Sequence, residues 1–163
     1  RPDLSRMAAV ARTLLRLLGR VPIALLLLVV AAAGCRDADA QAVSYRVIVN
    51  AQNPVTQLKR DDLSRLFLKK VVNWKTGAEV QPVDQAQDSP VRRSFTKDIH
   101  KKDVEQIKGY WQQLIFTGQG APPIEKGSDD EVVAFVAKTP AAIGYVSSTA
   151  ALGSGVKTVQ ILP

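Results

Sequence analysis

Two side chains in the stretch from Asp88 to Phe95 are of the types that bind an anion. Ser89 supplies a hydroxyl and Arg92, three residues later, a guanidinium, and both groups donate hydrogen bonds to phosphate or carboxylate oxygens. Ser89 is also a favoured N-cap residue and Pro90 suits the first helical position, so a helix is expected to start here. The free N–H groups of a helix start attract oxyanions. A second interpretation needs no ligand: a capped helix whose arginines face solvent.

The predicted elements that position this stretch alternate between strands and helices. Runs of β-branched residues predict strands, and amphipathic runs that begin with capping residues predict helices. Strands are expected at 45–50, 80–84, 142–146 and 156–162, and helices at 60–70, 90–100, 103–118 and 128–139. Residues 119–127 are expected to form a loop. Val91, Phe95 and Ile99 recur every fourth residue and are expected to face the core. This order predicts an α/β domain with helices on both faces of the sheet.

The first forty residues differ from the rest of the 163-residue chain. Several arginines precede an apolar run at 21–33 that is too short to span a bilayer comfortably. A basic segment followed by a short apolar one is typical of an export signal. We therefore expect a signal at 1–40 and an exported, periplasmic domain at 41–163.

Two processing sites compete at the end of this signal. Residues 38–40, Ala-Asp-Ala, have the small-x-small form that signal peptidase cleaves. Residues 32–35, Ala-Ala-Gly-Cys, resemble a bacterial lipobox, in which Cys35 would carry a lipid. The two alternatives stay open, and contact with a membrane is expected only through that lipid anchor. Cys35 is the single cysteine of the chain, so residues 41–163 contain no internal disulfide.

The remaining composition argues against several functions. The formal net charge is +7 for the whole chain and +4 for residues 41–163, a mild excess that does not favour nucleic acid. The single histidine, His100, has no second histidine or cysteine near it, so no metal site is expected. Asp84 is expected to be a turn residue. We find no nucleophile–base pair, so neither an enzyme nor a cofactor is predicted.

The order of the motifs resembles a known family. The residues that carry the likeness are Val47-Ile48-Val49-Asn50, Leu66-Phe67, Asn73-Trp74, Ser89-x-x-Arg92-x-x-Phe95 and Ala142-Ile143-Gly144-Tyr145-Val146. In this order, over roughly residues 45–162, they resemble the phosphate-type periplasmic solute-binding proteins of ABC transporters. The resemblance implies a single lobe of the type II periplasmic binding protein-like fold, similar to the second domain of the two-lobed clamp, with a mixed sheet and helices on both faces.

The same resemblance implies a set of ligand-binding residues. In that lobe the family carries an Arg-x-x-Gly-Ser-Gly-Thr-Arg segment, whose serine, glycine and threonine donate hydrogen bonds to the anion. Ser89 falls on the serine, Arg92 on the last arginine, Val91 on the threonine and Asp88 on the first glycine. These four residues are the expected oxyanion contacts, although valine lacks the hydroxyl of threonine and aspartate adds a negative charge. Gln85 stands in place of the earlier arginine, and a proline replaces the second glycine.

Two functions follow from these residues. The first is a solute-binding protein that receives phosphate or a related oxyanion at the Ser89 helix and serves an ABC permease or an envelope sensor. The second is an interaction module without a ligand, which keeps the lobe and binds an envelope protein through its surface. Ser89 and Arg92 favour the first, whereas Gln85 and Val91 favour the second because each replaces a residue that binds the anion.

Overall fold

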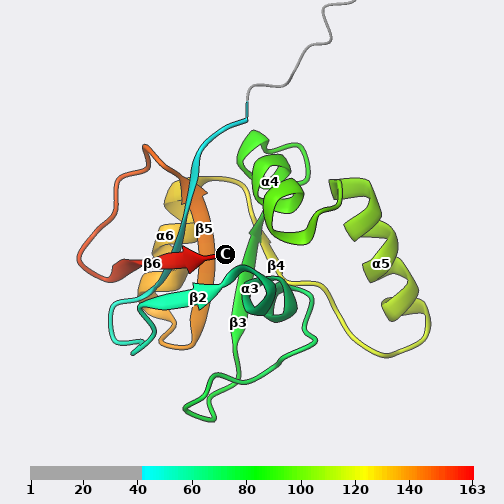
Figure 1. Ribbon diagram of the computed structural model, residues 1–163, viewed down its shortest axis with the longest axis horizontal. Coiled ribbons are helices and arrows are strands. Elements are labelled where there is room, and N and C mark those ends of the chain that lie inside the picture. Colours follow the sequence, from blue (N-terminus) through cyan, green and yellow to red (C-terminus); the bar gives the residue numbers. More distant parts are fainter. Residues whose placement is uncertain (1–41) are drawn as a thin grey trace, which may run out of the picture. The chain divides into compact units, whose positions relative to one another are not determined.

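The computed structural model describes residues 42–163 (Figure 1). The expected signal at 1–40, with Cys35, lies outside the described residues. Within 42–163, no helix has the length and apolar character that crossing a membrane requires.

The secondary structure confirms the eight elements expected from the sequence and adds others. The strands are β1 Tyr45–Asn50, β2 Gln57–Lys59, β3 Gln81–Gln85, β4 Ile124–Lys126, β5 Ala142–Ser147 and β6 Val156–Leu162. The helices are α3 Arg60–Phe67, α4 Pro90–Phe95, the π-helix η1 Thr96–His100, α5 Val104–Phe116 and α6 Asp129–Lys138. The prediction of a loop over all of 119–127 was wrong, because β4 lies within it. A strand of three residues is too short to give a sequence pattern.

The strands form one mixed sheet in the order β2-β6-β1-β5-β3-β4. The central strand β1 runs antiparallel to both β5 and β6. The outer pairs are parallel: β2 with β6, and β3 with both β5 and β4. This topology places the carboxyl end of β3 beside that of β4, and the residues expected to bind an anion follow β3 directly.

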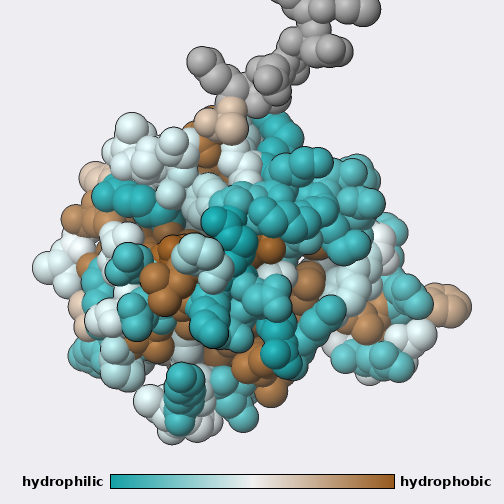
Figure 2. Space-filling model, in the orientation of Figure 1, coloured by the Kyte–Doolittle hydropathy of each residue, from teal (hydrophilic) through white to brown (hydrophobic). Residues whose placement is uncertain are grey.

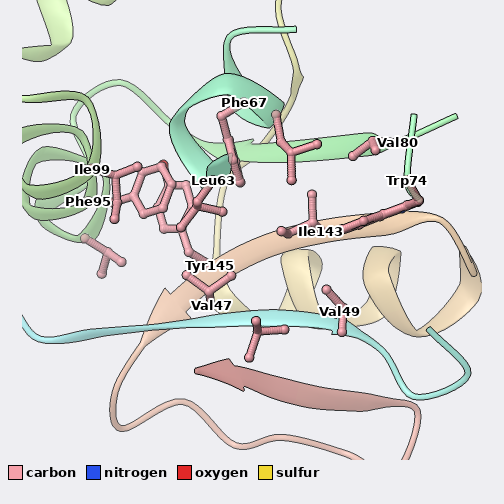
Figure 3. Packing of buried hydrophobic residues seen from close by; sticks show 13 residues of the cluster. Val47, Val49, Leu63, Phe67, Trp74, Val80, Phe95, Ile99, Ile143 and Tyr145 are labelled. Atoms are coloured by element: carbon pink, nitrogen blue, oxygen red, sulfur yellow. The ribbon is translucent and has the colours of Figure 1, made fainter. Parts of the chain in front are cut away.

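Helices cover both faces of this sheet, as expected. Val47 and Val49 of β1 belong to a hydrophobic cluster with residues of α3 and α4, whereas Ile48 belongs to another with α6. Successive residues of a strand point to opposite faces, so this alternation separates the two cores. Figure 3 shows the first cluster, in which the rings of Phe67, Phe95 and Tyr145 lie together.

Two helices end in a left-handed residue, one where it was not expected and one where it was. Helix α3 ends at Phe67 rather than at residue 70, because Lys69 adopts a left-handed conformation (φ 52°) and the Lys70 N–H bonds to the Arg65 carbonyl at 2.9 Å. This is a Schellman-type end, which glycine usually forms, so a lysine gives no signal for it. Gly118 has φ 68° and ends α5 in the same manner, as its type predicted.

The helix after Ser89 is α-helical only as far as Phe95 and continues as η1. Val91, Phe95 and Ile99 are all buried, as predicted from their spacing. Residues four apart drift by about 40° around a regular α-helix. The wider turn of the π-helix, closed by i→i+5 bonds, offsets this drift and keeps Ile99 on the buried face.

Candidate functional site

The candidate site lies at the carboxyl end of β3, where the chain turns into α4. Parallel pairing sets Asp84 of β3 opposite Glu125 of β4. Ser89 is the N-cap of α4, and Arg92 lies in its first turn. The local sequence accounts for this geometry, since Ser89 and Pro90 start the helix at once after a short loop. The side chain of Arg92 is thereby directed back at the end of β3.

Arg92 is buried and its guanidinium is bonded to groups of the protein itself. Only 4% of its surface is exposed. Nη2 lies 3.1 Å from Oδ2 of Asp84, Nη1 lies 2.7 Å from Oε1 of Glu125, and Nη1 also donates to the carbonyl of Gln85. Burial lowers the pKa of Arg92, but the two carboxylates outweigh burial and the net shift is upward. The guanidinium therefore stays protonated, and the carboxylates of Asp84 and Glu125 already balance its positive charge.

Asp84 is a buried partner in a network, not the turn residue that was expected. Its Oδ1 accepts the hydroxyl of Tyr145 and the backbone N–H of Gln85, the latter at 3.0 Å. Burial raises the pKa of Asp84, and the charge of Arg92 opposes that rise. The pKa of Tyr145 is also raised, by burial and by the neighbouring carboxylate, so its hydroxyl remains a donor.

Gln85 organises the polar side chains next to this pair. Its Oε1 accepts a hydrogen bond from Oγ of Ser89 at 2.6 Å, and its Nε2 donates to Oδ1 of Asp129 at 2.7 Å. The Ser89 hydroxyl also caps α4, weakly, by accepting the Arg92 N–H at 3.4 Å. Gln85, which stands where the resembling family has an arginine, thus accepts the hydrogen bond of the Ser89 hydroxyl.

The structure brings together two of the four expected oxyanion contacts. Ser89 and Arg92 meet at Gln85, as the preceding distances show. The side chain of Val91 is buried in the cluster of Phe95, so it packs in the core and is not directed at the polar network. Asp88 is exposed, and its carbonyl accepts a bond from Nη1 of Arg93 at 2.6 Å. These positions place Val91 and Asp88 outside the network.

Sequence reasoning missed two acidic members of the site, Glu125 and Asp129. Asp129 was seen only as part of a helix start, and Glu125 lay in the region expected to be a loop. Asp84 and Glu125 are paired with the guanidinium of Arg92, and Asp129 joins the same network through the side chain of Gln85. The pairing of β3 with β4, which links residues far apart in the chain, is the signal that would have revealed Glu125.

The site contains hydrogen-bond donors and carboxylates. Among residues 42–163, no three histidine, cysteine or acidic side chains are grouped so as to hold a metal ion. His100, the lone histidine, is half-buried between the rings of Phe67 and Phe95 and bonds through Nδ1 to Ser64. His100 therefore packs against the edge of the core near a helix end.

A groove of about 750 Å³ lies elsewhere, beside the first described residues. Its polar walls come from Tyr45, Arg60, Ser94, Lys97 and Asp98, and Asp98 is bonded to both Tyr45 and Arg60. The expected oxyanion contacts do not line this groove, which is therefore separate from the site at β3.

Comparison with known proteins identifies the fold. No family model matches the sequence, and no curated protein matches it. Among solved structures, the chain is similar to an ABC-type phosphate transport receptor from Vibrio cholerae, with a TM-score of 0.58 and 22% identity over 73% of this chain and 46% of that one. It is also similar to a putative phosphate ABC transporter substrate-binding protein with bound phosphate from Clostridium perfringens, with a TM-score of 0.59 and 20% identity over 73% and 45% of the two chains.

A possible phosphate binding protein from Planctomyces limnophilus gives a TM-score of 0.55 at 18% identity, over 75% of this chain and 43% of that one. The chain thus spans less than half the length of the solved proteins it matches. The structural match confirms the resemblance and the fold class expected from the sequence: an α/β domain with a mixed sheet, equivalent to one lobe of a type II phosphate-binding protein.

Proposed function

We propose that this chain is an exported, non-catalytic protein-binding lobe whose oxyanion site is closed by its own side chains. The observation that carries the proposal is the state of Arg92, which is buried and bonded to Asp84, Glu125 and the Gln85 carbonyl. A guanidinium offers five N–H donors in one plane. Three contacts with protein acceptors engage both terminal nitrogens of Arg92. The Ser89 hydroxyl is likewise used by Gln85.

Charge supports the same conclusion. A phosphate that approaches Arg92 meets Asp84, Glu125 and Asp129 within the same network. It must also displace a charge-assisted hydrogen bond, and such bonds contribute about 1.5–3 kcal/mol each. That cost alone reduces affinity by about ten- to a hundredfold. A lobe of this kind is unsuited to retain phosphate.

The surface proposed to contact a protein partner is the carboxyl-terminal end of α5. Ile115 is 55% exposed and Phe116 is 92% exposed. Helix α5 packs against the remainder of the domain through a small separate cluster of Leu68, Ile107 and Trp111. Figure 2 shows a hydrophobic area at the outer edge over α5. This exposed aromatic and aliphatic pair would fit an apolar pocket on the proposed partner.

Titration with inorganic phosphate at low salt tests the closed site. We expect no measurable heat up to millimolar phosphate with the purified protein, because the donors of Arg92 and Ser89 are occupied. Binding in the micromolar range would contradict the proposal, since it would show that the network opens readily for phosphate.

Photocrosslinking from α5 tests the partner surface. A photoreactive residue in place of Phe116 should give a defined crosslinked product in the native cell envelope, whereas the same residue in place of Glu105 should not. Glu105 lies on the same helix and its side chain is 78% exposed, so it controls for accessibility. Equal products from both positions, or none from Phe116, would remove α5 as the contact surface.

A second candidate function is oxyanion binding in connection with ABC-type uptake or sensing. The observation that favours it is the meeting of Ser89 and Arg92 at the end of β3, together with the phosphate present in one similar solved protein. In this case an ABC permease or an envelope sensor is the expected partner. The phosphate titration decides between the two candidates.

A further inference from the structure

The two carboxylates that bond to Arg92 differ in how the protein holds them. The side chain of Asp84 is 11% exposed and is also bonded by Tyr145 and by the Gln85 N–H. The side chain of Glu125 is 40% exposed. Within residues 42–163, the recorded polar partner of its carboxylate is Arg92 alone. Asp84 is therefore a fixed part of the core, whereas Glu125 reaches Arg92 from the solvent side.

The element that carries Glu125 is suited to release it. Strand β4 has three residues, forms the edge of the sheet and pairs with β3 alone. Short edge strands hold their side chains less firmly than central ones. Moving the Glu125 side chain into solvent leaves Arg92 paired with Asp84, so the buried charge stays compensated.

We propose that Arg92 is the centre of a latent oxyanion site and that Glu125 is the internal anion that closes it. The carboxylate of Glu125 takes the position on Nη1 that an oxygen of an external anion would take, at 2.7 Å. The inference rests on the proposed closure of the site and names the residue responsible. Gln85 contributes in a lesser way by holding the Ser89 hydroxyl, the second donor, at 2.6 Å.

The ligand that fits this site is a small tetrahedral oxyanion. Removing Glu125 frees one charged donor, Nη1 of Arg92. Arg92 and Ser89 both contact Gln85, and the Ser89 hydroxyl is the second donor proposed for the ligand. Asp84 and Asp129 remain, which favours an anion that carries a proton and can donate to a carboxylate. Inorganic phosphate meets this requirement at neutral pH, and sulfate, which is fully ionised, does not.

The test compares the protein with Glu125→Ala by phosphate titration at low salt. We expect Glu125→Ala to bind phosphate about ten- to a hundredfold more tightly than the unmodified protein. Sulfate should bind more weakly than phosphate to the same variant. The side-chain N–H resonances of Arg92 should shift on addition of phosphate, which locates the binding.

Glu105→Ala is the matched control, because it removes one exposed negative charge from α5 and changes the net charge equally. It should not gain phosphate binding. Glu125→Gln keeps the shape of the side chain while removing its charge, and it should gain binding even if the alanine variant folds poorly.

Three results would overturn the inference: no gain in either Glu125 variant with the fold intact, an equal gain in Glu105→Ala, or a gain without a shift of the Arg92 resonances. Tight binding by the unmodified protein that weakens on Glu125→Ala would also overturn it. Failure of the proposed function can be told apart from failure of this inference. The proposed function fails if the unmodified protein binds phosphate, whatever the Glu125 variants do.

Discussion

The ring of Phe95 lies parallel to the ring of Tyr145, with centroids 3.8 Å apart and 6° between the planes. The stack joins α4 to β5, and Tyr145 also bonds to Asp84, which pairs with Arg92 of the same α4. Helix α4 and strand β5 are therefore connected twice, through the stacked rings and through the polar contacts of Asp84. The position of the Arg92 guanidinium depends on this apolar stack as well as on charge.

Tyr145→Phe should destabilise the domain while keeping the stack. The substitution removes the donor that satisfies Oδ1 of Asp84, a buried acceptor. Loss of a partner by a buried polar group costs about 1–3 kcal/mol. Urea unfolding at neutral pH measures the difference. A change under about 0.5 kcal/mol would show that the Gln85 N–H and Arg92 satisfy Asp84 without the tyrosine.

Gly144→Ala should destabilise the domain by overpacking. A Cβ at this position would lie 2.7 Å from Cγ1 of Val83 and 2.8 Å from Cγ1 of Val132, on the face covered by α6. Such crowding in a packed core costs about 1–3 kcal/mol. Gly109→Ala in α5 is the matched control: a Cβ there meets nothing within 4 Å, so the variant should gain up to about 1 kcal/mol of helix stability. Thermal unfolding of both variants checks the opposite signs.

Stability should fall as the pH drops because of His100. Burial lowers its pKa to about 4, and the charge of Arg92 acts in the same direction. Between about pH 6.5 and 4 the unfolded chain binds a proton that the native chain does not, so the free energy of unfolding decreases by up to about 1.4 kcal/mol per pH unit.

The pH effect is measured by urea unfolding at about pH 7 and about pH 5, for the unmodified protein and for His100→Gln. The variant should lose less stability between the two conditions. The raised pKa of Asp84 acts in the opposite direction in both proteins, so the comparison isolates the histidine. An equal loss in both would mean that His100 titrates normally.

Cys35→Ala should move the protein from the membrane fraction to the soluble fraction. If Cys35 carries a lipid, that lipid contributes to holding the protein at the membrane, and its loss weakens the attachment. Cell fractionation of the unmodified protein and the variant gives the answer. Unchanged fractionation would favour cleavage after Ala40 instead.

The local parts of the fold could be predicted because each depends on neighbouring residues. Tyr45–Asn50 alternates between faces, and the two cores of β1 follow from that alternation. Three helices begin at N-cap residues that could be recognised in the sequence: Ser89, Asp103 and Ser128. Each of these side chains accepts a hydrogen bond from a backbone N–H of the first turn.

The contacts between Arg92 and its carboxylate partners could not be predicted from neighbouring residues. Arg92 and Glu125 are 33 residues apart, and they meet only because β4 pairs with β3 in one register. A three-residue strand carries no periodicity, so its partner and register are invisible in the sequence. Arg92 is followed by a second arginine and a serine, so the local sequence gave no indication that it would be buried with its counter-charges.

The order of strands in the sheet has a consequence for when the chain folds. Strand β1 is formed by residues 45–50, yet its two neighbours are β5 and β6, from residues 142–147 and 156–162. The middle of the sheet therefore stays unpaired until the last part of this domain has been synthesised. Such long-range pairing slows folding. If the chain is exported as proposed, this topology favours an extended chain until the last strands have been made, and translocation requires such a chain.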